Sequence, residues 1–429
     1  MEKNYQTKTA AAMIVPDSVA ITMTDLAEEL REGLLALAVG TGLQVMDVLL
    51  EESVTALAGP KGRHDPDRIA VRHGHDEGSV TLGGRRVPVR RPRVRSADGA
   101  RELAVPAYEH FSSTEILSRL AMEKMLAKLS TRRYKSGLEP VGERVEANAS
   151  STSRSAVSRR FVEATEHALG ELLAVNLSEL DLVALMVDGV HFGDHVCVVA
   201  MGIDITGRKR PLSITEGDTE NATVVKDLLV GLRDRGLEVT RPVLVVIDGA
   251  KALAGAVKAV FDHPVIHRCQ LHKIRNVESK LPKTLARTVT KKMRAIYHYD
   301  DALRAEAELE ELARQLQRSH PGAAGSLREG LAETLTVMAL KVPPTLGRTL
   351  RSTNAIESMI EICRDHSANV KRWRDGQMAL RWCAAGMVEA GKQFRKVNGF
   401  LHLPALRAAL DDYVERGVTP IDYNKEDAA

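Results

Sequence analysis

The sequence predicts an α/β protein with a mixed β-sheet core, an α-helical insertion within that core, and helical and small β segments before it. From residue 181 onward, Val- and Ile-rich runs alternate with amphipathic stretches in the order β-β-β-α-β-α-β. Such continuous apolar strands are typical of a sheet that helices cover on both faces. Residues 273–345 are charged and have a helical pattern throughout, which predicts the insertion.

The length and composition exclude several classes of protein. A chain of 429 residues exceeds the size at which single cores stop growing, about 250–300 residues, so we expect several domains. With 44% hydrophobic and 27% charged residues, wholesale disorder is excluded. The longest apolar runs, such as 182–187 and 243–247, fall far short of the ~20 residues that cross a bilayer.

Neither a secretory signal nor a disulfide framework is predicted. The N-terminus has no basic segment followed by a long apolar core. The four cysteines are widely spaced and include no Cys-x-x-Cys pair, which argues against disulfides and against a four-thiolate zinc site. We therefore expect a cytoplasmic protein with no membrane partner.

Three predicted segments precede the sheet. Residues 22–58 have apolar positions at three- and four-residue steps after a capping Thr24, which predicts a helix and a candidate dimer interface. Residues 59–110 are predicted to form a small basic β unit, with a hairpin turn at Gly83-Gly84. Residues 111–175 return to a helical pattern, in three pieces.

The β unit carries a dense run of positive charge. The net charge of the chain is only +3, from 60 basic and 57 acidic residues, so the overall balance says little about partners. Eleven residues of the β unit, however, contain six arginines and no acid, which suits a polyanion such as DNA. The candidate DNA-binding residues here are Arg85, Arg86, Arg90, Arg91, Arg93 and Arg95, followed by Arg132, Arg133 and Lys135 in the helical region.

The third helical piece resembles the second helix of a helix-turn-helix motif. It begins at a Ser/Thr cluster and is predicted to be short, with Arg154, Arg159 and Arg160 facing outward. In that motif, N-terminal residues reach base edges while basic side chains hold phosphates. The alternative is a solvated basic face on a structural helix.

Two aspartates and a glutamate are the candidate chemical groups. Asp188 and Asp248 are each predicted at the C-terminal end of a buried strand, where ligands usually bind in α/β sheets. The alternative is that each Asp-Gly pair is an ordinary turn. Glu357 begins a later helix, and Asn354 could cap that helix with Glu357 closing a capping box.

If the three acids converge, they need a cation. Carboxylates held close together repel one another and take up protons unless divalent ions neutralise them. All-oxygen ligands favour Mg²⁺ or Mn²⁺. Two such ions about 3.5–4 Å apart can activate a nucleophile and stabilise the leaving oxygen of a phosphodiester, which is nuclease and strand-transfer chemistry.

Four motifs together resemble the bacterial Mutator-type transposases, insertion-sequence enzymes with an RNase H-like catalytic core. The motifs are the two aspartate-bearing strands, RCQLHKIRN at 268–276 and STNAIES at 352–358. Asp248 follows Asp188 by 60 residues and Glu357 follows Asp248 by 109, which is similar to the helical insertion that the family has before its glutamate. The resemblance spans roughly residues 20–415 and implies that Asp188, Asp248 and Glu357 are Asp-Asp-Glu ligands of two metal ions.

The Cys-x-x-His pair, Cys269 and His272, matches a signature that follows the second aspartate in this family. One Cys and one His are half a zinc site at most, although His263 and His267 lie nearby in sequence. We expect the pair to pack near the active centre instead. Further candidates for that neighbourhood are Arg275, Asn276 and Asn354.

The resemblance implies a transposase that binds the terminal inverted repeats of its element and cuts and joins DNA. Its partners would be the double-stranded DNA of element ends and target, in a homodimer or larger assembly. One alternative is a catalytically idle DNA-binding regulator derived from a transposase, and another is an unrelated metal-dependent nuclease or phosphatase. The expected domains are 1–58, 59–110, 111–175, a core of 176–272 and 346–395, the insertion 273–345, and a C-terminal helix and tail at 396–429.

Overall fold

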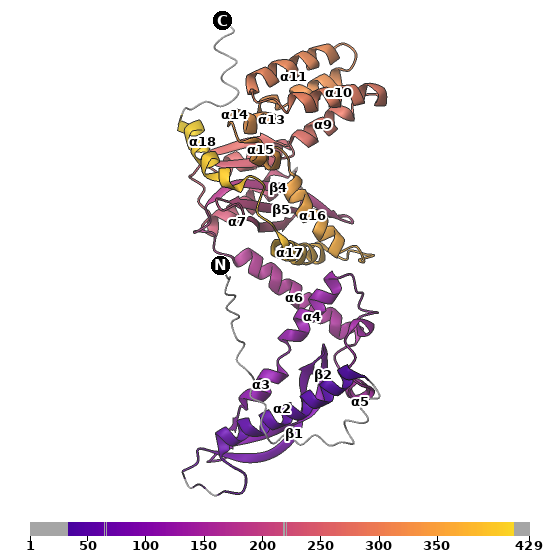
Figure 1. Cartoon of the computed structure of the whole chain (residues 1–429), viewed down its shortest axis with the longest axis vertical. Coiled ribbons are helices and arrows are strands. Elements are labelled where there is room, and N and C mark those ends of the chain that lie inside the picture. Colours follow the sequence, from indigo (N-terminus) through magenta and orange to yellow (C-terminus); the bar gives the residue numbers. More distant parts are fainter. Residues whose placement is uncertain (1–32, 64, 66, 218, 220, 416–429) are drawn as a thin grey trace, which may run out of the picture. The chain divides into compact units, whose positions relative to one another are not determined.

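The computed structural model describes residues 33–63, 65, 67–217, 219 and 221–415. The chain divides into two compact units, Met1–Ala164 and Thr165–Ala429 (Figure 1). The predicted start of the first helix at 22–32, with its Thr24 cap, and the predicted tail at 419–429 lie outside the described residues.

In the first unit, one helix packs on a β-hairpin. The elements are α2 (Leu34–Ala58), β1 (Ala70–Leu82), β2 (Arg85–Ser96) and the short β3 (Glu102–Leu103), with all strands antiparallel. The turn falls at Gly83 and Gly84, whose φ angles of 52° and 78° lie in the left-handed region that suits glycine. This confirms the predicted hairpin. Met46, Leu50 and Val54 of α2 are buried in the same clusters as valines of β1 and β2.

The rest of the first unit is helical but more broken than expected. It contains α3 (Pro106–Ser112), α4 (Glu115–Leu126), the 3₁₀ turn η1 (Lys135–Gly137), α5 (Glu143–Asn148) and the start of α6 (Arg154–Ala174). The second predicted helical piece is mostly irregular, because Gly137, Pro140 and Gly142 interrupt it, and Gly142 has a φ of 89°. Helix α6 has 21 residues rather than a short span, and the division between the units falls within it.

The second unit is built on a five-stranded mixed sheet with strand order β6-β5-β4-β7-β8. The strands are β4 (Leu182–Phe192), β5 (His195–Asp204), β6 (Lys209–Glu216), β7 (Val243–Ile247) and β8 (Pro264–Arg268). Strands β4, β5 and β6 pair antiparallel, whereas β4, β7 and β8 pair parallel. The parallel pairs require crossovers, which α7 (Ala222–Asp234) and α8 (Lys251–Val260) supply. The predicted mixed sheet and order of elements are confirmed.

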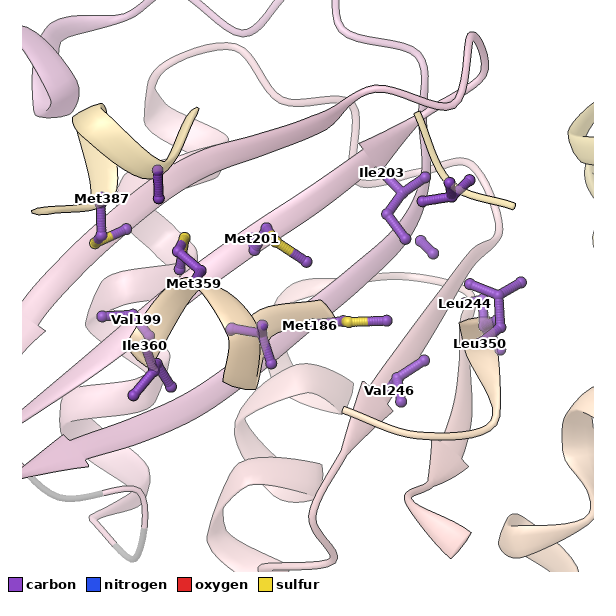
Figure 2. Close-up of a cluster of buried hydrophobic side chains, with 14 of the residues drawn as sticks. Met186, Val199, Met201, Ile203, Leu244, Val246, Leu350, Met359, Ile360 and Met387 are labelled. Carbon is purple, nitrogen blue, oxygen red and sulfur yellow. The ribbon is translucent and has the colours of Figure 1, made fainter. Parts of the chain in front are cut away.

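Helices cover both faces of this sheet. Helices α16 (Asn354–His366), α17 (Gly376–Gln393) and α18 (Leu403–Glu415) pack on one face, and α7 and α8 pack on the other. Successive residues of a strand point to opposite faces. Met186 of β4 and Val246 of β7 therefore join Met359 of α16 in one cluster (Figure 2), while their neighbours in sequence join the other.

The predicted insertion is helical and has a hydrophobic cluster of its own. It comprises α9 (Gln270–Glu278), α10 (Lys283–Ile296), α11 (Ala302–Leu316), α12 (Pro321–Arg328), α13 (Leu331–Thr334) and α14 (Thr336–Ala339), and α15 (Pro344–Leu350) leads back to α16 (Figure 1). In the described part of the chain, no helix is long and apolar enough to cross a membrane.

Candidate active site

Asp188 lies within a strand rather than at its end, which corrects the sequence prediction. Strand β4 continues to Phe192, and Asp188 pairs with Val199 of β5. The parallel neighbour β7 pairs only with Ala184–Met186, so the antiparallel ladder with β5 is what extends the strand. Asp188-Gly189 is therefore no turn, and the turn instead follows Phe192 at a left-handed Gly193 with φ 62°.

Asp248 directly follows β7, as predicted. Its Oδ1 accepts a hydrogen bond of 3.0 Å from the backbone N–H of Ala250, which leads into α8. The next residue, Gly249, has a φ of 115°, a conformation that L side chains rarely adopt. The Asp-Gly pair thus turns the chain at the position where the Asp248 side chain leaves the sheet.

Glu357 lies in the first turn of α16, but not in the capping box that the sequence allowed. The N-cap is Thr353, and Asn354 is already the first helical residue. Thr353 Oγ1 donates a hydrogen bond of 2.8 Å to Glu357 Oε1, and Glu357 N donates one of 2.9 Å to Thr353 O. The Glu357 carboxylate is therefore held by the residue at the cap.

The three acids come together on one face of the sheet. Asp188 and Asp248 each lie two residues after a residue that faces α16, Met186 and Val246 respectively. Residues two apart along a strand point to the same face of the sheet. Burial, together with the negative charges of Asp248 and Glu357, raises the pKa of Asp188 to about 6 against the opposing effects of the Gly189 N–H and His272. Carboxylates that are far apart in sequence thus act on one another.

Within the described ranges, no three His, Cys, Asp or Glu side chains form a group that could hold a metal ion as they stand. The donor chemistry nevertheless fits a hard divalent cation. Asp188 bears a half-buried charge that two neighbouring acids disfavour, and all six side-chain donor atoms of the three residues are oxygens. Asp188, Asp248 and Glu357 are the residues that could hold such a cation.

Cys269 and His272 lie beside Glu357. His272 Nε2 is 3.8 Å from Glu357 Oε1, and His272 Nδ1 is 3.3 Å from Thr353 Oγ1. A hydrogen bond with Cys269 raises the pKa of His272. Burial raises the pKa of the Cys269 thiol, but hydrogen bonds with His272 and Thr353 outweigh it and lower that pKa overall. Cys269 and His272 thus bind each other, Thr353 and Glu357, and the buried His267 is not part of this network.

Sequence reasoning missed Thr353. It is fully buried, and its backbone N–H donates to Cys269 Sγ at 3.4 Å. Gln270 N also donates to Arg351 O at 3.1 Å, so the two ends of the insertion are joined. The sequence does offer one indication of this role, because the Thr353 hydroxyl lies four residues before Glu357, within STNAIES. Of the other candidates in this neighbourhood, Arg275, Asn276 and Asn354 have exposed side chains.

Four of the six arginines of β2 bind other groups within the first unit, three of them in ion pairs. Arg85 is buried, forms an ion pair of 2.6 Å with Glu146 and donates to two backbone carbonyls. Arg86 donates to Ser79 and to the Ser112 carbonyl. Arg91 and Arg93 pair with Glu102 at 3.3 Å and 2.7 Å. This corrects the expectation of a free cationic run, because only Arg90 of the six has an exposed side chain.

The basic residues of the helical region also include both exposed side chains and side chains that are paired or half-buried. Arg132, Arg133, Arg154 and Arg159 are exposed. Lys135 pairs with Glu146 at 2.7 Å. Arg160 does not face outward as predicted, because it is half-buried and donates to Ser151 O at 2.6 Å. Burial lowers the pKa of Arg160.

Known proteins resemble this chain over most of its length. The family model described as Transposase, Mutator family, matches residues 19–397. The transposase for insertion sequence element ISRM5 of Rhizobium meliloti (strain 1021) is 28% identical over 370 residues, which are 85% of this chain and 89% of that protein. The transposase for IS6120 of Mycolicibacterium smegmatis is 31% identical over 239 residues, 54% of this chain and 72% of that protein. The transposase for IS256 in transposon Tn4001 of Staphylococcus aureus is 24% identical over 334 residues, 75% of this chain and 82% of that protein.

Proposed function

The chain belongs to the Mutator family of transposases, and we propose that it binds the terminal inverted repeats of an insertion sequence and catalyses metal-dependent cleavage and transfer of DNA strands at Asp188, Asp248 and Glu357. One observation carries the proposal. The pKa of Asp188 is raised to about 6 by burial and by the charges of the other two acids, which is the electrostatic signature of carboxylates gathered at one point.

We also propose that the second unit is an RNase H-like catalytic core. Its support is the strand order β6-β5-β4-β7-β8, in which β4 carries Asp188 and the adjacent parallel strand β7 leads to Asp248. The long helical insertion between β8 and α16 delays Glu357 in sequence but returns it to the face that carries both aspartates.

In the proposed reaction, Asp188, Asp248 and Glu357 hold Mg²⁺ or Mn²⁺. The bound ions would supply Lewis acidity that activates the attacking oxygen and stabilises the leaving oxygen. The chain itself orients the ligands. Thr353 donates to Glu357 Oε1, the Gly189 N–H donates to Asp188 Oδ1 at 2.7 Å, and His272 lies against Glu357. Water attacks first and the freed 3′-hydroxyl attacks second, so the protein forms no covalent intermediate.

DNA binding by the first unit is part of the proposal. Its support is the set of exposed basic side chains Arg90, Arg132, Arg133, Arg154 and Arg159. Because one reaction joins two element ends, we propose at least a dimer on bacterial cytoplasmic DNA. The alternative of an idle regulator leaves unexplained why all three acids are present with Thr353 bound to one of them.

The test uses purified full-length protein, a duplex carrying an element end, and Mg²⁺. D188N, D248N and E357Q should each lower strand cleavage by about 10³-fold or more while end binding changes by less than about twofold. T353V should lower strand cleavage about 10–100-fold, as is usual when a group that orients a metal ligand is removed. Asp262→Asn, an exposed acid after α8, is the matched control. Cleavage retained by one of the three main variants would remove that residue from the site.

A further inference from the structure

Helix α10 of the insertion carries a row of positive charges on one exposed face. Lys283, Arg287, Lys291 and Arg294 are all exposed and recur at three- and four-residue steps, which aligns them along the helix. The helix also contains Lys292 and has no Asp or Glu in its 14 residues. Its buried face, which includes Val289 and Met293, packs into the cluster of the insertion.

The charges of this row lack acidic partners. Among the described residues, no carboxylate lies within ion-pair distance of the five cations of α10. The next helix, α11, shows the usual arrangement, since Arg304 pairs with Glu308 at 3.7 Å and Arg314 with Glu311 at 2.8 Å. The insertion thus has one helix whose arginines are paired with acids and one whose cations have no acidic partner in the described part of the chain.

The row ends at a cavity that adds two more arginines. Arg294, Arg348 and Arg351 line a space of about 200 Å³, with Leu271 and Ile274 among its apolar residues. Burial lowers the pKa of Arg351, and the positive charge of Arg348 lowers it further. An anion placed beside Arg348 and Arg351 would relieve the repulsion between their two positive charges.

The cavity adjoins the candidate active site. Asn354 also lines it, and Glu357 is one helical turn further along α16. Arg351 is two residues before Thr353, which binds Glu357. A phosphate held at this cavity would belong to the stretch of DNA next to the bond that is cut.

We propose that the exposed face of α10 and the cavity arginines Arg348 and Arg351 bind the DNA backbone beside the cleaved phosphodiester. This rests on the proposed function. Lys283 and Arg294 lie about 16 Å apart along the helix axis at ~1.5 Å per residue, which is roughly the length of five base pairs at ~3.4 Å each. The cations also offset the repulsion between three carboxylates and a polyanion, which favours DNA over an acidic protein segment as the occupant.

The first test compares two variants that remove equal charge from the insertion. K283Q/R287Q/K291Q removes three cations of the α10 face, and R304Q/R314Q/R318Q removes three from α11 and the turn after it. Binding to an unrelated duplex is measured from 50 to 300 mM salt, because backbone contacts need no particular sequence. The α10 variant should flatten the slope of log affinity against log salt by about 2–3, and the α11 variant should leave it unchanged. Equal slopes in both would overturn the inference.

The second test locates the cavity phosphate. Single methylphosphonate linkages, which are uncharged, are placed along the strand near the cut site, and binding is compared between wild type and R348Q/R351Q. A neutral linkage within a few nucleotides of the cut should weaken wild-type binding by about tenfold but should not weaken the variant further. Independent effects at every position would overturn the assignment of the cavity.

The two proposals can fail separately. If wild type cuts no DNA but the α10 variant still flattens the salt slope, the DNA-backbone surface stands and the proposed catalysis falls. If wild type cuts normally and the α10 variant binds like the α11 variant, the surface falls and the proposed catalysis stands. Thermal unfolding of each variant checks that the fold is intact.

Discussion

Strand β2 and helix α10 are both dense in positive charge, but most arginines of the strand are paired or half-buried, whereas the cations of the helix have no acidic partner among the described residues. Six arginines lie in eleven residues of the strand, and five cations lie in the fourteen residues of the helix. Alternation along β2 turns Arg85 inward, and acids from other segments pair with three of the six arginines: Glu146 with Arg85, and Glu102 with Arg91 and Arg93. In α10 the helical period places four cations on one exposed face, and within the described ranges no acid forms an ion pair with them. The density of charge in the sequence therefore does not by itself predict a binding surface. Whether the cations stay exposed also depends on the repeat of the strand or helix that carries them and on acids that are distant in sequence.

The largest effect expected from this comparison is on stability. Arg85→Met should lower the free energy of unfolding of the β-hairpin by about 3 kcal/mol, because it removes a buried guanidinium that pairs with the half-buried Glu146 and donates to two backbone carbonyls. Lys291→Gln on α10 should change stability by less than about 0.5 kcal/mol. Hydrogen exchange of the β2 amides measures the first change and that of the α10 amides the second. Equal small effects would mean that Arg85 is as free as the helix cations.

Acids in the two units should respond to pH with opposite signs. The folded pKa of Asp188, about 6, exceeds its ordinary value of 3.8, so its charge opposes folding and stability falls as pH rises from about 4 to about 6. The loss is about 3 kcal/mol. The hydrogen bond from Arg93 lowers the pKa of Glu102, so its contribution is present above pH 4.5 and is lost as pH falls through the folded pKa.

Urea unfolding in EDTA measures both signs as differences from D188N and from E102Q between pH 3 and 8. Wild type should lose stability relative to D188N as pH rises and gain it relative to E102Q. If the metal proposal is right, Mg²⁺ removes most of the loss relative to D188N, because a cation stabilises the charged form of Asp188. A pH-independent difference from D188N would contradict the raised pKa.

The smallest expected effect is on DNA affinity. R91Q/R93Q should change binding to duplex DNA by less than about twofold, because Glu102, together with Asp76 at 3.6 Å from Arg91, already offsets the charges of these arginines. E102Q should instead strengthen binding and steepen its salt dependence, because it frees them. A loss above tenfold in R91Q/R93Q would show that DNA displaces Glu102 and that β2 and α10 behave alike.

The sequence predicted the elements of the second unit better than their edges. The order of strands and helices, the position of Asp248 and the helical insertion follow from the spacing of apolar residues within each segment, which can be read from the local sequence. The length of β4 does not, because β5 pairs with Asp188 and Gly189 and extends the strand past its apolar run. A partner strand can override a local turn signal.

The partners of individual side chains could not be predicted from the sequence, because they are also distant along the chain. Glu146 lies 61 positions after Arg85, and Thr353 meets Cys269 across the whole insertion. No local pattern ties such residues together. The sequence favours Asn354 as the cap of α16, but Thr353 occupies that position, where its backbone N–H donates to the distant Cys269.

The hydrogen bond between Gln270 and Arg351 has a consequence for how the insertion can change. Because the chain leaves the sheet and comes back at nearly the same point, the helices between form a cassette whose two ends meet, and α13 and α14 attach it further to β8 through the Arg268–Glu333 ion pair and the Thr336 hydrogen bond to the Ile266 carbonyl. Such a cassette can be shortened, lengthened or exchanged with that of a related protein while the carboxylate on α16 keeps its place. Grafting experiments across the family therefore have a natural pair of splice points.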